Sequence, residues 1–149
     1  MNIHFICRGN VLRSLTAETY LKSLGIKNIN ATSSGAIVDW TSPIEQSYFA
    51  NTLILLDRHG IKCYAKNSPD QLTQSRTDNQ DITVFMNQRV YDESIQIVSL
   101  PSNAIDWNIT DIGEGQRMVK KNRHEYEEEI YLEIVAKVDT LVNKYHLSK

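Results

Sequence analysis

Residues 2–25, from Asn2 to Gly25, read NIHFICRGNVLRSLTAETYLKSLG, and this stretch decides the fold. The apolar residues at 3–6 predict a short strand. Beyond residue 14, apolar residues recur with the spacing of one helical face and end at a glycine suited to a C-terminal cap: Ala17, Leu21, Leu24 and Gly25. Residues 7–14 must therefore turn a strand directly into a helix.

This turn carries residues suited to binding an oxyanion. The amides of a tight loop that runs into a helix N-terminus point the same way, and the helix dipole adds to their attraction for an anion. Arg13 at the helix start can grip two oxygens of a phosphate or arsenate. Cys7 at the base of the loop would lie in this positive potential, which favours the thiolate. A cysteine at a strand end is more often a small buried hydrophobic residue, but the joint pattern favours a nucleophile beneath a bound oxyanion.

Residues 7–14, CRGNVLRS, resemble the phosphate-binding loop of the low-molecular-weight protein tyrosine phosphatases. Thioredoxin-coupled arsenate reductases and protein arginine phosphatases are close relatives within that family. The resemblance implies that Cys7 is the nucleophile and that Arg13 holds the phosphate. It also implies that Ser14 donates to the Cys7 sulfur and that Asn10 fixes the loop. It assigns substrate binding to the other loop residues and to one later aromatic residue: Arg8, Gly9, Asn10, Val11, Leu12, Ser14 and Trp40.

The same resemblance suggests roles for two residues downstream of the loop. The family's Ser-Ala-Gly turn falls at residues 33–35, where a hydroxyl helps to hold the loop asparagine, so Ser33 would support Asn10. An exposed turn serine is the alternative interpretation. The family also has an aromatic wall of the substrate cleft near this point, and Trp40 is the candidate for it. A tryptophan that covers the core is an equally good interpretation.

Length and composition are those of one soluble domain spanning residues 1–149. The net charge of −2 favours neither a nucleic acid nor a membrane surface as a partner, and the sequence indicates no oligomeric state. We expect no signal peptide and no membrane span, since no apolar run approaches about 18 residues. The two cysteines, Cys7 and Cys63, form no disulfide framework, so a reducing cytoplasm is the expected location. No metal or cofactor is expected, because the histidines lie in separate segments: His4, His59, His124 and His146.

Downstream of residue 25, predicted strands alternate with predicted helices. Strands are expected at 26–31, 81–86 and 94–100, and helices at 43–59, 87–92 and 117–145, with a surface segment and a short helix at 61–81. The capping box Ser42-Pro43-Ile44-Glu45 opens the helix at 43–59. Strands separated by helical connections imply a parallel sheet. The expected fold is therefore α/β, a flavodoxin-like three-layer sandwich with a central four-stranded parallel sheet in the order 2-1-3-4 and helices on both faces. The loop at 7–14 would lie at the carboxyl edge of the sheet.

A phosphatase of this kind also needs an acid. Attack on a phosphomonoester expels an alkoxide or phenoxide, which leaves faster when a nearby carboxylic acid protonates it. The loop at 101–116 holds two aspartates, Asp106 and Asp111. The family places its acid in a Trp-x-Ile-x-Asp-Pro-like segment, and Trp107, Ile109 and Asp111 match that spacing, so the resemblance favours Asp111. The segment departs from the family in the three residues that follow: Ile112, Gly113 and Glu114.

The leading hypothesis is a phosphomonoester hydrolase that works through a cysteinyl-phosphate on a phosphotyrosine-containing protein or a small phosphomonoester. Val11 favours phosphotyrosine, because the resembling arginine phosphatases have threonine at this position. Arsenate reduction is a second hypothesis, but Leu12 occupies the place where many relatives keep a second loop cysteine, which leaves Cys63 alone. The third is a non-catalytic phosphate-binding regulatory module.

Overall fold

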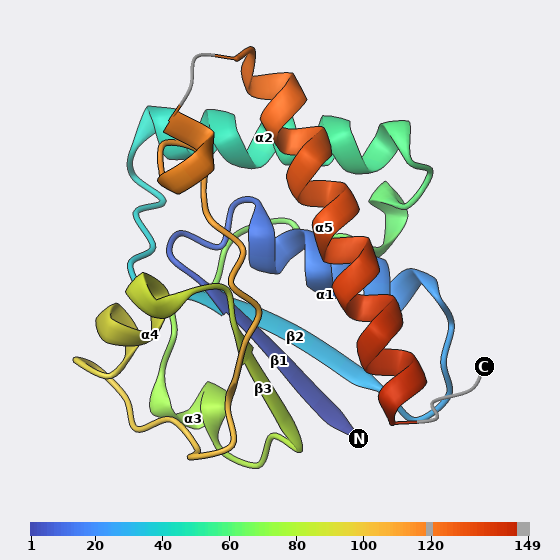
Figure 1. Ribbon diagram of the computed structural model, residues 1–149, viewed down its shortest axis with the longest axis vertical. Helices are drawn as coiled ribbons and strands as arrows, with labels where there is room; N and C mark the ends of the chain where they lie inside the picture. Colours follow the sequence, from blue (N-terminus) through green and yellow to red (C-terminus); the bar gives the residue numbers. More distant parts are fainter. Residues whose placement is uncertain (119–120, 146–149) are drawn as a thin grey trace.

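The computed structural model describes residues 1–118 and 121–145, and its centre is a four-stranded parallel sheet in the order β2-β1-β3-β4. Figure 1 labels β1, β2 and β3, with β1 in the middle. The strands are β1 (Asn2–Cys7), β2 (Asn30–Gly35), β3 (Ile82–Phe85) and β4 (Ile105–Asp106). Every described strand pair is parallel, so each connection crosses over through helical or irregular segments. The predicted sheet order 2-1-3-4 is confirmed.

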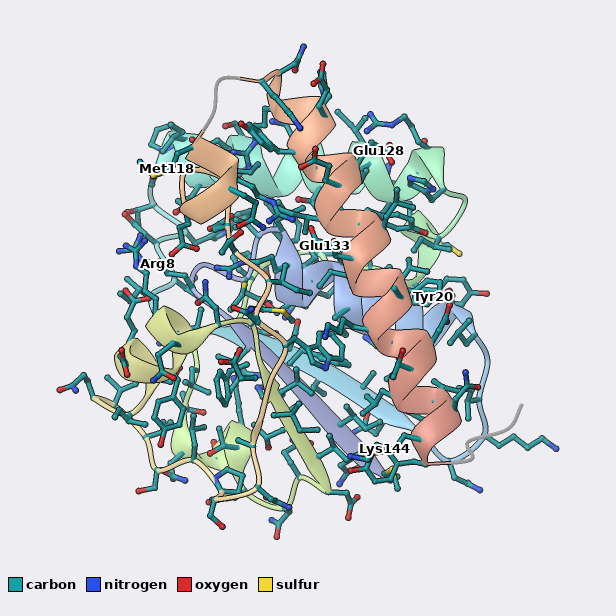
Figure 2. All side chains as sticks on the ribbon, viewed as in Figure 1. Arg8, Tyr20, Met118, Glu128, Glu133 and Lys144 are labelled. Carbon is teal, nitrogen blue, oxygen red and sulfur yellow. The ribbon has the colours of Figure 1, made fainter. Side chains whose placement is uncertain are left out.

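Helices cover both faces of this sheet, as predicted. The elements are α1 (Arg13–Ser23), α2 (Pro43–Arg58), η1 (Lys62–Tyr64), α3 (Gln74–Thr77), α4 (Gln88–Ser94), η2 (Gly115–Met118) and α5 (Arg123–Lys144). Helices α1 and α5 pack against each other, and Tyr20 Oη joins them by donating to Asp139 Oδ1 at 2.8 Å. In the view of Figure 2, Tyr20 lies on the side of the molecule away from Arg8.

The two faces of β1 have different neighbours because successive side chains point to opposite sides. Phe5 packs against the Trp107 ring at 5.3 Å between centroids. His4 points to the other face, where its ring nitrogens lie 2.6 Å from Thr32 Oγ1 and 2.8 Å from Ser34 Oγ. Phe85 of β3 pairs in register with Ile6 and so lies on the same face of the sheet as His4. There the Tyr91 ring of α4 packs against Phe85, with 5.0 Å between ring centroids. The centre of the sheet, at β1 and β3, is thus covered by side chains on both faces.

Two predicted strands were misplaced. The strand expected at 26–31 begins only at Asn30, because Asn28 turns the chain with a φ of +63°. The strand expected at 94–100 does not form, since α4 extends to Ser94 and the chain then turns. The fourth strand comes later, where Ile105 pairs with Val84 at the sheet edge.

The helix ends agree more closely with the sequence pattern. Ser42 Oγ caps α2 by accepting from the Glu45 amide at 3.4 Å, and Pro43 is its first residue. The last helix starts at Arg123 rather than at 117, and Asn122 caps it. Residues 119–120, within the helix predicted at 117–145, and His146 lie outside the described residues. In the described part of the chain, no helix is both long and apolar enough to cross a bilayer.

Candidate active site

The loop between β1 and α1 is held against the end of β2. The Ala36 amide donates to Cys7 O at 3.0 Å, and the Ile37 amide donates to Arg8 O at 2.8 Å. Gly35 lies so close to the loop that a Cβ there would fall 2.7 Å from Arg8 O and 2.8 Å from the Asn10 nitrogen. The loop backbone can therefore take this path only over a glycine.

Asn10 fixes the shape of the loop through its own backbone conformation and its side-chain hydrogen bonds. Its φ of +56° lies in the left-handed region, where asparagine is better tolerated than most residues. Its side-chain amide donates to Ser14 Oγ at 2.7 Å and to Ser33 Oγ at 2.9 Å. Its side-chain oxygen, Oδ1, accepts from the Asp70 amide at 2.9 Å. Ser33 thus contacts Asn10 and is 1% exposed, so it is not an exposed turn serine.

The sulfur of Cys7 lies at the base of the loop with two hydrogen-bond partners. Ser14 Oγ is 2.9 Å from Sγ, and the Asn10 amide donates to Sγ at 3.2 Å. Ser14 Oγ accepts from Asn10 Nδ2, and its own hydrogen can point at the sulfur or at Ser34 O, which lies 3.4 Å away. The sulfur is thus held at the base of the loop by the Asn10 amide and the Ser14 hydroxyl.

Arg13 joins the loop to the segment that carries Asp111. Its guanidinium is 2% exposed and donates to Ile109 O at 2.9 Å. Its Nη2 lies 3.5 Å from Asp111 Oδ2. These contacts hold the guanidinium in place, and it lines the same cavity as Cys7.

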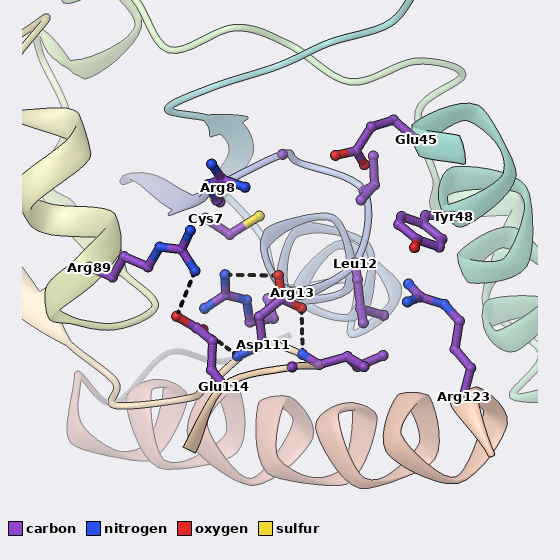
Figure 3. A pocket seen from close by; sticks show the side chains of 14 residues that line it. Cys7, Arg8, Leu12, Arg13, Glu45, Tyr48, Arg89, Asp111, Glu114 and Arg123 are labelled. Carbon is purple, nitrogen blue, oxygen red and sulfur yellow. Dashed lines mark hydrogen bonds and ion pairs between the residues drawn. The ribbon is translucent and has the colours of Figure 1, made fainter. Parts of the chain in front are cut away.

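These groups surround a cavity of about 270 Å³, which Figure 3 shows from close by. The predicted site residues that line it are Cys7, Arg8, Gly9, Val11, Leu12, Arg13 and Asp111. Asn10, Ser14 and Ser33 do not line the cavity; their side chains hydrogen-bond to one another and fix the shape of the loop. The structure does not bring Trp40 to this cavity. Instead, the Trp40 ring packs edge-on against Phe49 at 5.3 Å and is 40% exposed.

Of the two aspartates, Asp111 lines the cavity and Asp106 does not. Asp106 Oδ1 accepts from the Asn108 amide at 2.7 Å, the usual contact of a turn aspartate. Asp111 Oδ1 accepts from the Ile112 amide at 2.8 Å, and Oδ2 faces Arg13. The carboxyl group of Asp111 is thereby held at the edge of the cavity.

Glu114 anchors the segment that carries Asp111. Its Oε1 accepts from the Asp111 amide at 2.7 Å and from Asn87 Nδ2 at 3.2 Å, and Arg89 lies 3.3 Å from Oε2. Burial opposes ionisation of this carboxyl group, but the Asp111 amide, the charge of Arg13 and the hydrogen bonds from Arg89 and Asn87 together outweigh burial. The pKa of Glu114 is therefore lowered below its usual value.

The sequence analysis did not assign seven residues of the cavity wall to the site: Glu45, Tyr48, Arg89, Ile112, Gly113, Glu114 and Arg123. They come from α2, α4, α5 and the segment after Asp111, so no local motif connects them with the loop. Glu45 was interpreted only as part of a capping box. Among residues 1–118 and 121–145, no group of three or more His, Cys, Asp or Glu side chains is arranged to hold a metal ion.

Solved structures with a similar fold include phosphatases and an arsenate reductase, all at low sequence identity. Vibrio vulnificus Wzb, solved with benzylphosphonate, has a TM-score of 0.71 at 18% identity, and the match covers 96% of this chain and 97% of that one. A Drosophila arginine phosphatase has a TM-score of 0.68 at 17% identity, with 97% and 98% covered. A thioredoxin-dependent arsenate reductase of Corynebacterium glutamicum has a TM-score of 0.67 at 20% identity, with 96% and 60% covered.

The fold and the loop together define a phosphatase-type protein of the low-molecular-weight class. The family model described as low molecular weight phosphotyrosine protein phosphatase matches residues 2–146, and the chain belongs to this family. A sequence search of curated proteins gives no significant match.

Proposed function

We propose that this chain, acting as a single phosphatase-like domain of residues 1–149, hydrolyses phosphotyrosine through a cysteinyl-phosphate intermediate. The observation that supports this most directly is that Cys7, Arg13 and Asp111 line one cavity, with the sulfur at the base of an amide-rich loop. The chemistry uses neither a metal nor a cofactor. A thiolate nucleophile needs a reducing compartment, so the proposed location is the cytoplasm.

In the first step, the Cys7 thiolate attacks phosphorus and the bond to the leaving oxygen breaks. The loop amides and the Arg13 guanidinium hold the equatorial oxygens as negative charge spreads over them. Asp111, in its protonated form, gives its proton to the leaving oxygen. Asp111 is the candidate because it is the aspartate that lines the cavity.

In the second step, the ionised Asp111 takes a proton from water, which attacks phosphorus and releases Cys7 as the thiolate. Ser14 stabilises the departing sulfur from 2.9 Å. The nucleophile returns to its starting state, and the products are phosphate and the dephosphorylated hydroxyl compound.

Phosphotyrosine is favoured by an apolar and an aromatic wall residue. Val11 and Tyr48 both line the cavity, where they can contact a phenol ring. The benzylphosphonate bound by the Vibrio vulnificus protein is itself an aryl compound that carries a phosphonate. A protein with an exposed phosphotyrosine or a small aryl phosphate is therefore the proposed partner.

Arsenate reduction receives less support from the site. It needs further thiols to carry a disulfide, and the second cysteine, Cys63, lies in η1, is exposed and does not line the cavity. A non-catalytic phosphate-binding module is the remaining alternative, and a turnover experiment separates it from an enzyme.

The test measures p-nitrophenyl phosphate hydrolysis by the wild type and three variants. We expect Cys7→Ser to abolish turnover, and Asp111→Asn to slow it by at least about tenfold, the low end for loss of a general acid. Asp106→Asn is the matched control and should retain the wild-type rate, because Asp106 lies outside the cavity. Equal rates in the wild type and Cys7→Ser would refute the proposal. Thiol-dependent loss of arsenate without phosphatase turnover would point to the reductase instead.

A further inference from the structure

The charges around the cavity are paired with one exception. Each of the four arginines that line it has a carboxylate within reach: Arg8 with Glu93 at 3.0 Å, Arg13 with Asp111 at 3.5 Å, Arg89 with Glu114 at 3.3 Å and Arg123 with Glu127 at 3.2 Å. Arg123 also lies 3.7 Å above the Tyr48 ring. Within the part of the chain that the structure describes, the remaining acid of the wall, Glu45, has no ion pair.

Glu45 is not used by its own helix either. In a complete capping box, its carboxylate would accept from the Ser42 amide. That amide donates instead to Asp39 O at 3.3 Å, so only the Ser42 half of the box forms. The Glu45 carboxylate points toward the phosphate loop (Figure 3), and both its oxygens would lie 3.7 Å from a Cβ built on Gly9.

The surroundings of Glu45 disfavour its negative charge. Burial raises the pKa of Glu45 above its usual value, and the charge of Asp111 across the cavity adds to this effect. Asp39 acts in the same direction, whereas the charges of Arg8 and Arg123 oppose it. A cation from the substrate would remove this cost, because it would give the carboxylate the partner that the chain itself does not supply.

We propose that Glu45 is a specificity-determining residue that binds a positively charged side chain next to the phosphotyrosine of the substrate. This inference rests on the proposed function and names the substrate class more closely, as phosphotyrosine segments with an adjacent arginine or lysine. Glu45 lies on the other side of Cys7 from Arg89 (Figure 3). The basic neighbour would therefore enter on the α2 side, away from the paired Arg89 and Glu114.

The test uses three phosphotyrosine peptides that differ only in the residues flanking the phosphotyrosine, which are arginine, glutamine or glutamate. The wild type should prefer them in that order, with kcat/KM for the arginine peptide about fivefold above that for the glutamine peptide, the scale of a partly exposed ion pair. The preference should decrease as salt is added, because the interaction is between charges near the surface.

Glu45→Gln should bring the arginine-to-glutamine ratio of kcat/KM close to one, and Glu45→Lys should favour the glutamate peptide. Glu125→Gln is the matched control, since it removes the same charge from an exposed position in the first turn of α5, outside the cavity. It should keep the wild-type ratio. The ratio is measured within each protein, so a variant with lower overall activity remains informative.

Two failures can be told apart. If the wild type hydrolyses all three peptides at equal efficiency, or if Glu45→Gln keeps the wild-type ratio, this inference is wrong and the proposed function stands. If the wild type hydrolyses neither the peptides nor p-nitrophenyl phosphate, the proposed function is wrong and the inference fails with it.

Discussion

The base and the wall of the cavity are built in different ways. The base is the β1–α1 loop, whose groups come from eight consecutive residues, 7–14, and are tied to β2 by Ser33 and Gly35. The wall comes from α2, α4, α5 and the segment after Asp111; an ion pair joins α4 to that segment, and Arg123 of α5 lies over the Tyr48 ring of α2. The base thus supplies the reacting groups from one local motif, whereas the wall that faces the leaving group depends on distant parts of the chain.

The largest expected effect follows from filling the space beneath the base. In Gly35→Ala, the new methyl group would fall within 2.8 Å of three backbone atoms of residues 8–10. The loop must shift, and a displacement of about 1 Å at reacting groups costs on the order of a hundredfold in rate. We expect kcat/KM for p-nitrophenyl phosphate to fall at least that far, with weaker inhibition by inorganic phosphate.

Gly60→Ala separates this effect from a general loss of stability. Gly60 follows α2 with a φ of +73°, and a Cβ added there would have no atom within 4 Å, so alanine is strained at this position without touching the loop. It should lower the unfolding midpoint and leave phosphate inhibition unchanged. If Gly35→Ala behaved in the same way, the close approach of β2 would not shape the base.

The second prediction concerns the effect of low pH on β1, the strand that leads into the base of the cavity. Burial, with smaller effects from Lys66 and Arg76, lowers the pKa of His4 from 6.5 to about 4, while its ring holds Thr32 and Ser34. The folded pKa is depressed, so the folded state binds fewer protons than the unfolded chain between pH 6.5 and 4. His4 therefore contributes stability that is present above pH 6.5 and is lost as the pH falls toward 4, on the order of 3 kcal/mol in all.

Urea unfolding of the wild type and His4→Gln at pH 7 and pH 4 measures this contribution. The wild type should lose about 3 kcal/mol more than the variant between these two values. The carboxylates titrate in both proteins, so their contribution to the pH dependence of stability cancels in the difference. Parallel stability profiles for the two proteins would show that His4 does not confer this acid sensitivity.

The same contrast explains what the sequence could predict. The loop at 7–14 and the helix that follows are read from consecutive residues, and the parallel direction of the strands followed from the alternation of strands and helices. The position of β2 was missed because its residues Thr32, Ser33 and Ser34 are polar, and their burial depends on His4 and Asn10 from elsewhere in the chain. Local hydrophobicity cannot show such pairing.

The fourth strand was misplaced for a related reason. The β-branched run at 94–100 looks like a strand, but Ile95 and Ile97 are exposed, and two residues at 105–106 suffice to pair with the sheet edge.

The wall of the cavity was missed because its contacts join distant parts of the chain. Glu114 has no local feature that marks it, because its partners Asn87 and Arg89 are more than twenty positions away. Only the folded chain brings these groups to the segment that carries Asp111.

The smallest expected effect comes from loosening the wall while the base stays intact. In Glu114→Ala, the Asp111 amide loses the carboxylate that accepts from it at 2.7 Å, and Arg89 loses its partner at 3.3 Å. Asp111 should then donate its proton less effectively, and kcat should fall by about tenfold at most. Inhibition by inorganic phosphate should be unchanged, because the loop and Arg13 still hold the anion.

A series of aryl phosphates tests whether this effect passes through the acid. When protonation of the leaving group is impaired, the rate depends more steeply on the leaving-group pKa, so Glu114→Ala should slow poor leaving groups more than good ones. Glu93→Ala is the matched control, because it removes the carboxylate that pairs with Arg8 at 3.0 Å and with Arg89 at 4.0 Å but leaves Glu114 in place on the Asp111 amide. An equal loss for every leaving group, or weaker phosphate inhibition in Glu114→Ala, would mean that Glu114 supports the base as well as the wall, and the two regions would not be separable.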